Sequence, residues 1–348
     1  MAAERTSVTE LATAAGMILG QHHHDLALLE ALEIPGIDDS VWRPFLEPAA
    51  ESWHQFHPIL RTALANGAAF REAVLKGRDP DRIEWRGAKQ TMWVSDTPAD
   101  LTVNETIHVS AKYDSKCFLN RAPAALFHDL LAGTTKKKRP DWCGVVASNA
   151  YGVFYRVVLD TLREQGAPLI GFPATPTELT KAQRLEVKYL MKLWQTGMLQ
   201  AVASAYRELA SAVSIASATA WREALTSATE TVKISMIAQM LRVSGTTYWL
   251  LGHAGGQPVQ HQVVGTHKLR EVYRLKTFAV IDRPHAGQPR VDWEATLLPK
   301  KDAPAWATPR VVNGICEVRW SHQKLQGNPE CKVQLKTPVA DLPGYLPL

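Results

Sequence analysis

The sequence predicts an α/β (α+β) protein, because three different patterns follow one another along its 348 residues. Alternating polar and apolar residues between positions 100 and 115 predict a β-hairpin, residues 177–243 favour helix, and short strand-like runs follow residue 245. Helical and strand-like segments combined in this way are typical of mixed domains. We therefore expect a mixed sheet core with a large helical insertion and a β-rich C-terminal region.

The region before the hairpin is expected to be mainly helical. Helical spacing of apolar residues, and a stop at Gly77 followed by Pro80, predict two helices there. Two helices and two short strands precede the hairpin and one helix follows it: helices over 6–32 and 45–77, strands over 82–86 and 91–94, and a helix over 118–132.

The middle and the end of the chain differ sharply. Residues 177–243 contain one glycine, Gly197, and no proline, so one long helix or a helical hairpin is expected. Strand-like runs then alternate with Gly and Pro: 246–251, 262–265, 277–281, 290–298, 314–320 and 332–336. The expected domains are an N-terminal helical region (1–80), an α/β core (81–147 and 246–348) and a helical insertion (148–245).

The hairpin has a well-specified register. Its apolar residues alternate with polar ones on both strands: Leu101 and Val103 on the first, then Ile107, Val109 and Ala111 on the second. A loop at 104–106 pairs the two sets on one face, and a slip of one residue breaks the match. The same register places Asp100 opposite Ser110, with Lys112 two residues further along the polar face.

A carboxylate and a lysine at one end of a hairpin can hold a divalent cation beside an anionic substrate. The pattern resembles the PD-(D/E)XK nuclease superfamily, whose fold is restriction-endonuclease-like. The resemblance implies that Asp100 is the first acid, Ser110 occupies the second acidic position, and Lys112 is the lysine. It also implies Mg²⁺ or Mn²⁺ as cofactor and hydrolysis of a phosphodiester bond by in-line attack of water.

This chain departs from the superfamily at two points. Its Pro98-Ala99-Asp100 shifts the proline-acid step by one residue, and a serine at position 110 is a poor metal ligand. In some restriction enzymes with Ser-x-Lys, an acid from a nearby helix fills the gap. We consider Asp114 first for this role, then Glu72, then Asp129.

Composition narrows the function classes. Hydrophobic residues make up 46%, charged residues 21%, and the formal net charge is +5, which is compatible with nucleic acid. The four cysteines form no Cys-x-x-Cys pair, and no stretch reaches the roughly 20 apolar residues of a membrane span. No Walker, dinucleotide-binding, zinc-protease or serine-hydrolase motif occurs. We expect a cytoplasmic protein without a membrane partner.

Clustered cations suggest double-stranded DNA as the partner. Side chains that can reach phosphates or base edges are Lys116, Lys136, Lys137, Lys138, Arg139, Arg319 and Lys324. A solvated charge run and the polar face of a sheet explain the same residues without a ligand. A homodimer is also considered, because cutting both strands of a duplex commonly uses two copies.

The sequence therefore predicts a Mg²⁺-dependent DNA endonuclease of restriction-enzyme type. One alternative is a catalytically inactive DNA-binding or regulatory protein on the same fold, as Ser110 suggests. Another is a nuclease that acts on RNA. A carboxylate close to Asp100 and Lys112 in the folded chain favours the enzyme over the inactive binder.

Overall fold

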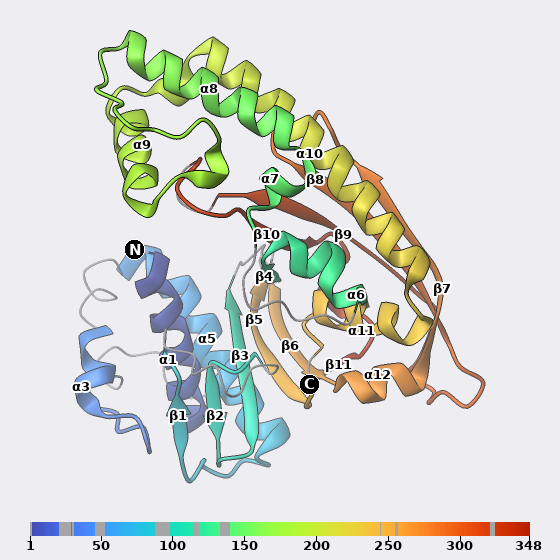
Figure 1. The fold of residues 1–348 in the computed structure, drawn as a ribbon. Helices are drawn as coiled ribbons and strands as arrows, with labels where there is room; N and C mark the ends of the chain where they lie inside the picture. The colour runs from blue at the N-terminus through green and yellow to red at the C-terminus, as the bar shows by residue number, and fades with distance from the viewer. Residues whose placement is uncertain are drawn as a thin grey trace. The chain divides into compact units, whose positions relative to one another are not determined.

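The computed structural model describes most of the chain (Figure 1). The described residues are 2–20, 29, 31–45, 53–87, 98–113, 118–132, 140–243, 245–254, 257–320 and 324–348. They form two compact units: unit 1 comprises Met1–Lys116, Arg242–Val272 and Pro338–Leu348, and unit 2 comprises Cys117–Leu241 and Tyr273–Thr337. Both units combine helices with a sheet, so the predicted α/β (α+β) class is confirmed.

Unit 1 contains a six-stranded mixed sheet. In spatial order its strands are β1 (Ile83–Trp85), β2 (Leu101–Val103), β3 (Ile107–Tyr113), β5 (Tyr248–Ala254), β6 (Gln257–Val263) and β11 (Tyr345–Pro347). Strands β1, β2 and β3 are successively antiparallel, whereas β5 runs parallel to β3. The long excursion between β3 and β5 carries all of unit 2 up to Leu241.

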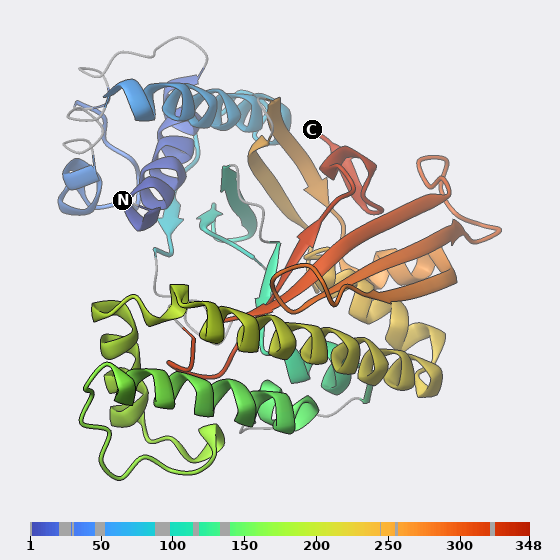
Figure 2. The ribbon, with the colours of Figure 1, turned by 90° about the horizontal axis from the view of Figure 1, so that it is seen from above.

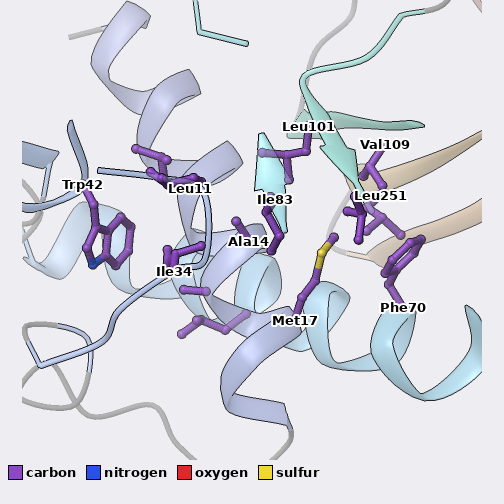
Figure 3. Close-up of a cluster of buried hydrophobic side chains, with 14 of the residues drawn as sticks. Leu11, Ala14, Met17, Ile34, Trp42, Phe70, Ile83, Leu101, Val109 and Leu251 are labelled. Carbon is purple, nitrogen blue, oxygen red and sulfur yellow. The ribbon is translucent and has the colours of Figure 1, made fainter. Parts of the chain in front are cut away.

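Two long helices cover one face of this sheet, α1 (Ala2–Leu19) and α5 (Trp53–Val74). They pack closely because glycines stand at the contact: a Cβ on Gly16 lies 2.1 Å from the Leu64 carbonyl oxygen, and one on Gly67 lies 2.2 Å from the Thr13 carbonyl oxygen. Figure 3 shows the apolar core beneath them, where Leu11 and Met17 meet Leu101, Val109 and Leu251. The shorter helical elements of unit 1 are α3 (Asp39–Trp42), η2 (Arg43–Phe45), α12 (Thr266–Val272) and η6 (Val339–Asp341).

Unit 2 contains a five-stranded antiparallel sheet. In spatial order its strands are β4 (Leu119–Arg121), β10 (Glu330–Leu335), β9 (Arg310–Arg319), β8 (Arg290–Pro299) and β7 (Tyr273–Asp282). An aromatic stack joins helix and sheet: the Trp221 ring lies 5.5 Å from Phe278, which stacks 5.9 Å from Trp293. Such stacks add to the apolar area that the core buries.

The helices of unit 2 include the segment 177–243 that was expected to form one long helix or a helical hairpin. They are η3 (Ala125–Asp129), α6 (Leu130–Ala132), α7 (Trp142–Val146), α8 (Ser148–Glu164), η4 (Pro176–Glu178), α9 (Lys181–Leu193), η5 (Thr196–Met198), α10 (Gln200–Ser227) and α11 (Glu230–Met240). Figure 2 shows α8 and α10 side by side. The block 177–243 thus forms three α-helices, because Gln195 takes a left-handed conformation before Gly197 and Thr229 caps a new helix.

Three expectations differ from the structure. Residues 1–80 are part of unit 1, together with the hairpin, and do not form a region of their own. Four of the late strand-like runs build the sheet of unit 2, and only β5, β6 and β11 extend the sheet of the hairpin. Residues 119–121 form strand β4, not helix, because Pro123 disfavours helix at the preceding residue and the helix starts at Pro123.

The expected strand at 91–94 lies outside the described residues. Across the described ranges, no helix has the length and apolar character needed to cross a bilayer.

Candidate functional site

The predicted hairpin register is confirmed. Leu101 pairs with Val109 and Val103 with Ile107. Beyond the paired residues, the Asp100 N–H donates to the Val109 carbonyl oxygen at 2.8 Å. On the polar face of the hairpin Ser110 is buried, 1% exposed, whereas His108 and Lys112 are partly exposed.

Asp100 is held in place by the opposite strand. Its Oδ2 atom accepts hydrogen bonds from the Ser110 hydroxyl at 3.0 Å and from the Ala111 N–H at 2.7 Å. Two donors on one oxygen fix the orientation of the carboxylate. Ser110 therefore touches the predicted first acid directly.

Glu10, on α1, is a second carboxylate near Asp100. Its Oε2 atom accepts a hydrogen bond from the Trp85 indole N–H at 2.8 Å, which ties the acid to strand β1. Glu10 is 6% exposed, and its electrostatic environment includes both Asp100 and Lys112. Helix α1 and the hairpin thus bring two acids and one lysine to the same part of unit 1.

This environment works against ionisation of Glu10. Burial, and next the Asp100 carboxylate, raise its pKa from 4.5 to about 7, although the Trp85 hydrogen bond and the Lys112 ammonium oppose the shift. A buried carboxyl beside a second acid is destabilised in its charged form.

A hydrogen-bond network holds α1 in position relative to Lys112. The Tyr113 hydroxyl, next to Lys112, lies 2.8 Å from the Thr13 hydroxyl one helical turn beyond Glu10. Asn66 of α5 donates to Tyr113 at 3.4 Å and to the Gly252 carbonyl oxygen at 2.7 Å. Because the network is buried, it fixes the distance between α1 and the end of β3.

Gly252 allows a close strand approach at Lys112. The two residues pair in the parallel register of β3 and β5, and a Cβ on Gly252 lies 1.8 Å from the Lys112 carbonyl oxygen. Any larger side chain displaces the backbone that carries Lys112.

Of the acids expected to replace the missing carboxylate, only Glu72 can be placed relative to Glu10 within unit 1. Glu72 is exposed on the last turn of α5, where the neighbouring Arg71 approaches Gly20. Gly20 follows Glu10 by ten residues, about 15 Å along a helix, so Glu72 is at the far end of α1 from Glu10. Asp129 belongs to unit 2 and lies 3.2 Å from the His128 ring. Asp114 lies outside the described residues.

Two of the predicted nucleic-acid contacts have partners within unit 2. The Arg319 guanidinium lies 3.5 Å from Glu317, and the Lys324 ammonium lies 3.8 Å from the centre of the Tyr206 ring. Burial lowers the pKa of Lys324. The remaining predicted contacts are not among the described residues: Lys116, Lys136, Lys137, Lys138 and Arg139.

Sequence reasoning missed Glu10, although a signal was present. Glu10 is the only charged residue between positions 6 and 21. A single acid inside an otherwise uncharged helix is costly to bury, so it points to a specific role for that carboxylate. Its partners Trp85 and Asp100 are remote in sequence, and no local pattern connects them to α1.

Within the described ranges, no group of three or more His, Cys, Asp and Glu side chains is arranged to hold a metal ion. Comparison with family models, with curated proteins and with solved structures gave no match to this chain.

Proposed function

We propose that the chain is a Mg²⁺- or Mn²⁺-dependent endonuclease that hydrolyses phosphodiester bonds in DNA. The observation that carries this proposal is the grouping of Glu10, Asp100 and Lys112 at the open end of the hairpin. A buried acid whose pKa is raised towards neutrality beside a second acid is typical of a functional site.

The donor set fits the cation. Mg²⁺ is usually held by one or two carboxylates, with water and substrate oxygens as its other ligands. Glu10 Oε1 and Asp100 Oδ1 accept no hydrogen bond from the described residues, so both atoms are available as ligands. When bound, the cation neutralises charge on the phosphate and lowers the pKa of water.

The other residues have distinct roles in this proposal. Lys112 offsets the negative charge that develops on the scissile phosphate. Ser110 acts as a positioning residue, because its hydroxyl orients Asp100 through the 3.0 Å hydrogen bond. Glu10 supplies the ligand that a serine at position 110 cannot supply.

The resemblance to PD-(D/E)XK nucleases supports the same assignment. In that superfamily, a helix acid replaces the missing carboxylate in some Ser-x-Lys enzymes, and Glu10 is an acid on a helix. The order of α1, α5, β1, β2 and β3 is also the helix-strand-strand-strand order that the resemblance requires.

Glu10 favours the enzyme over an inactive DNA-binding protein, because a protein that only binds has no need for a destabilising buried acid next to Asp100. The described residues do not discriminate between deoxyribose and ribose, so RNA is the competing substrate. We propose the cytoplasm as the location, since the described cysteines are free thiols: Cys143, Cys316 and Cys331.

A homodimer is part of the proposal. One face of α9 exposes three apolar side chains at four-residue spacing, Leu185 (47%), Tyr189 (64%) and Leu193 (55%). Exposed apolar stripes of this kind are typical of helix-mediated association. Sedimentation of the wild type and of Tyr189→Glu tests this part, with a monomeric wild type as the contradicting result.

The direct test of the function is incubation of the purified protein with plasmid DNA and Mg²⁺, with EDTA as the control. We expect nicking or linearisation that Lys112→Ala abolishes, with circular dichroism to verify that the variant folds. A duplex RNA of the same length separates the two substrates. Cleavage that is unchanged in Lys112→Ala or in EDTA contradicts the proposal.

A further inference from the structure

Arg86 is a partly buried cation close to the candidate site. It follows strand β1, and its backbone N–H donates to the Asp100 carbonyl oxygen at 3.0 Å. Its side-chain Nε donates to the Thr102 hydroxyl at 3.1 Å, and Thr102 is 3% exposed. Arg86 thus lies on the polar face of the hairpin that also carries Ser110, and it is itself partly exposed.

The Arg86 guanidinium has no carboxylate partner among the described residues. The nearest acid on its own strand, Glu84, lies 3.1 Å from Arg82 instead. Only Nε is used in a described side-chain hydrogen bond, so both terminal nitrogens retain their donors. A partly buried cation is costly without an anion, and a guanidinium held by its Nε presents the two terminal nitrogens in a fixed plane.

His108 lies beside Arg86 and offers hydrogen-bonding atoms without a negative charge. His108 pairs with Thr102 across the hairpin, and its Nδ1 atom is buried without a hydrogen-bond partner in the described structure. Burial, followed by the Arg86 charge, lowers the pKa of His108, so the ring is neutral at physiological pH. The Arg86 guanidinium therefore faces a neutral, hydrogen-bonding surface.

We infer that Arg86 binds a backbone phosphate of the nucleic-acid substrate, next to the scissile one, with His108 as a hydrogen-bonding neighbour. The spacing supports a second phosphate: Thr102 and Lys112 lie on opposite sides of the Asp100–Ser110 level, each about 7 Å from it along the strands. A planar guanidinium with two unused nitrogens suits bidentate contact to phosphate oxygens. This inference rests on the proposed function, because it assumes a nucleic-acid substrate.

The test is duplex DNA binding by fluorescence anisotropy at several salt concentrations, in EDTA so that no cleavage occurs. We expect Arg86→Gln to weaken binding about tenfold and to reduce the log–log salt slope by about 0.9, the value for one phosphate contact. Arg86→Lys should keep most of the slope, because the charge remains. Arg82→Gln is the matched control: Arg82 is nearby, exposed and paired with Glu84, so its loss should leave both quantities unchanged.

The outcomes separate this inference from the proposed function. A wild-type salt slope near zero overturns the nucleic-acid substrate and the role of Arg86 together. A steep wild-type slope that Arg86→Gln and Arg86→Lys both leave unchanged overturns the role of Arg86 alone. With cleavage restored by Mg²⁺, a phosphate contact predicts a raised KM for Arg86→Gln at nearly constant kcat, whereas equal losses caused by Arg82→Gln contradict it.

Discussion

The two units each bury a carboxyl group, Glu10 in unit 1 and Asp292 in unit 2, and the surroundings shift the two pKa values in opposite directions. In unit 1, Glu10 and Asp100 share one nearby lysine, and the pKa of Glu10 rises to about 7. In unit 2, Asp292 of β8 accepts hydrogen bonds from three cations, Arg290 at 2.7 Å, Arg283 at 3.0 Å and Lys336 at 3.1 Å. Burial alone raises the pKa of Asp292, but these three donors outweigh it and lower the pKa below 3.8.

The contrast separates a carboxylate that neighbouring cations neutralise from a carboxyl group that burial keeps protonated to higher pH. Asp292 is already neutralised by its neighbours, so it stabilises unit 2 and offers nothing to a metal ion. In unit 1, the Lys112 ammonium acts on Glu10 only through its charge, and among the described residues no cation donates a hydrogen bond to the side chain of Glu10 or Asp100. Two carboxyl groups of similar exposure, Glu10 at 6% and Asp292 at 5%, thus have pKa values shifted in opposite directions by their surroundings.

The largest expected difference between the clusters concerns catalysis. Asp100→Asn should reduce Mg²⁺-dependent cleavage by at least about a hundredfold, because a neutral amide is a weaker ligand for a hard cation. Asp292→Asn removes a buried carboxylate outside the candidate site and should leave the cleavage rate unchanged. Plasmid nicking rates for both variants measure this difference. Equal losses of cleavage activity in the two variants would contradict the assignment of Asp100 to the site.

The second difference concerns stability at alkaline pH. Glu10→Gln removes the cost of a buried charge while keeping an acceptor for the Trp85 N–H. At pH 8 in EDTA, it should raise the free energy of unfolding by up to about 3 kcal/mol, since one pKa unit is worth about 1.4 kcal/mol. Urea denaturation measures this change, and destabilisation by Glu10→Gln would contradict it.

The third prediction is that removing the buried carboxylate of unit 2 lowers the stability of the protein. Asp292→Asn should lower the free energy of unfolding by about 2 kcal/mol, because hydrogen bonds to a charged group are lost and three cations are left without their acceptor. The same denaturation experiment at pH 7 measures it. Glu294→Gln, an exposed change on the same strand, is the control and should have little effect.

The last prediction of this comparison is the dependence of stability on pH. The folded pKa of Glu10 exceeds its unfolded value of 4.5, so the folded state binds the extra proton and stability falls as pH rises from 4.5 to about 7. Asp292 acts in the opposite sense, since its stabilising effect is present above pH 4 and is lost as pH falls through its lowered pKa. Glu10→Gln should reduce the decline in the free energy of unfolding between pH 4.5 and 7. Unfolding curves at four pH values measure this, and a decline as steep as that of the wild type would contradict the prediction.

The sequence predicted the hairpin better than the site it belongs to. Strict alternation over Leu101–Ala111 specifies register because a one-residue slip turns every apolar side chain to the wrong face. The late strands were recognised as strand-like runs between Gly and Pro, but these signals do not determine strand partners, so their division between two sheets was missed. Strand β4 depends wholly on pairing with Cys331–Val333, more than 200 residues away.

Glu10 was missed because its role arises only in the folded chain. The acid expected near Lys112 was sought close in sequence, at Asp114, or at Glu72 and Asp129. The packing of α1 against α5 and the Thr13–Tyr113 hydrogen bond bring residue 10 to the hairpin instead. Tertiary packing of this kind leaves no periodic trace beyond the isolated charge itself.

The central claim is that Glu10 and Asp100 together hold a divalent cation, and calorimetric titration with Mg²⁺ or Mn²⁺ tests it most directly. We predict one binding event at pH 8 for the wild type and for Asp292→Asn, and at least about tenfold weaker binding for Glu10→Gln and Asp100→Asn. Wild-type affinity should fall as the pH drops below 7, because the cation then displaces the proton of Glu10. Equal affinity of the wild type and Glu10→Gln at pH 8, or no binding by the wild type, would contradict the account.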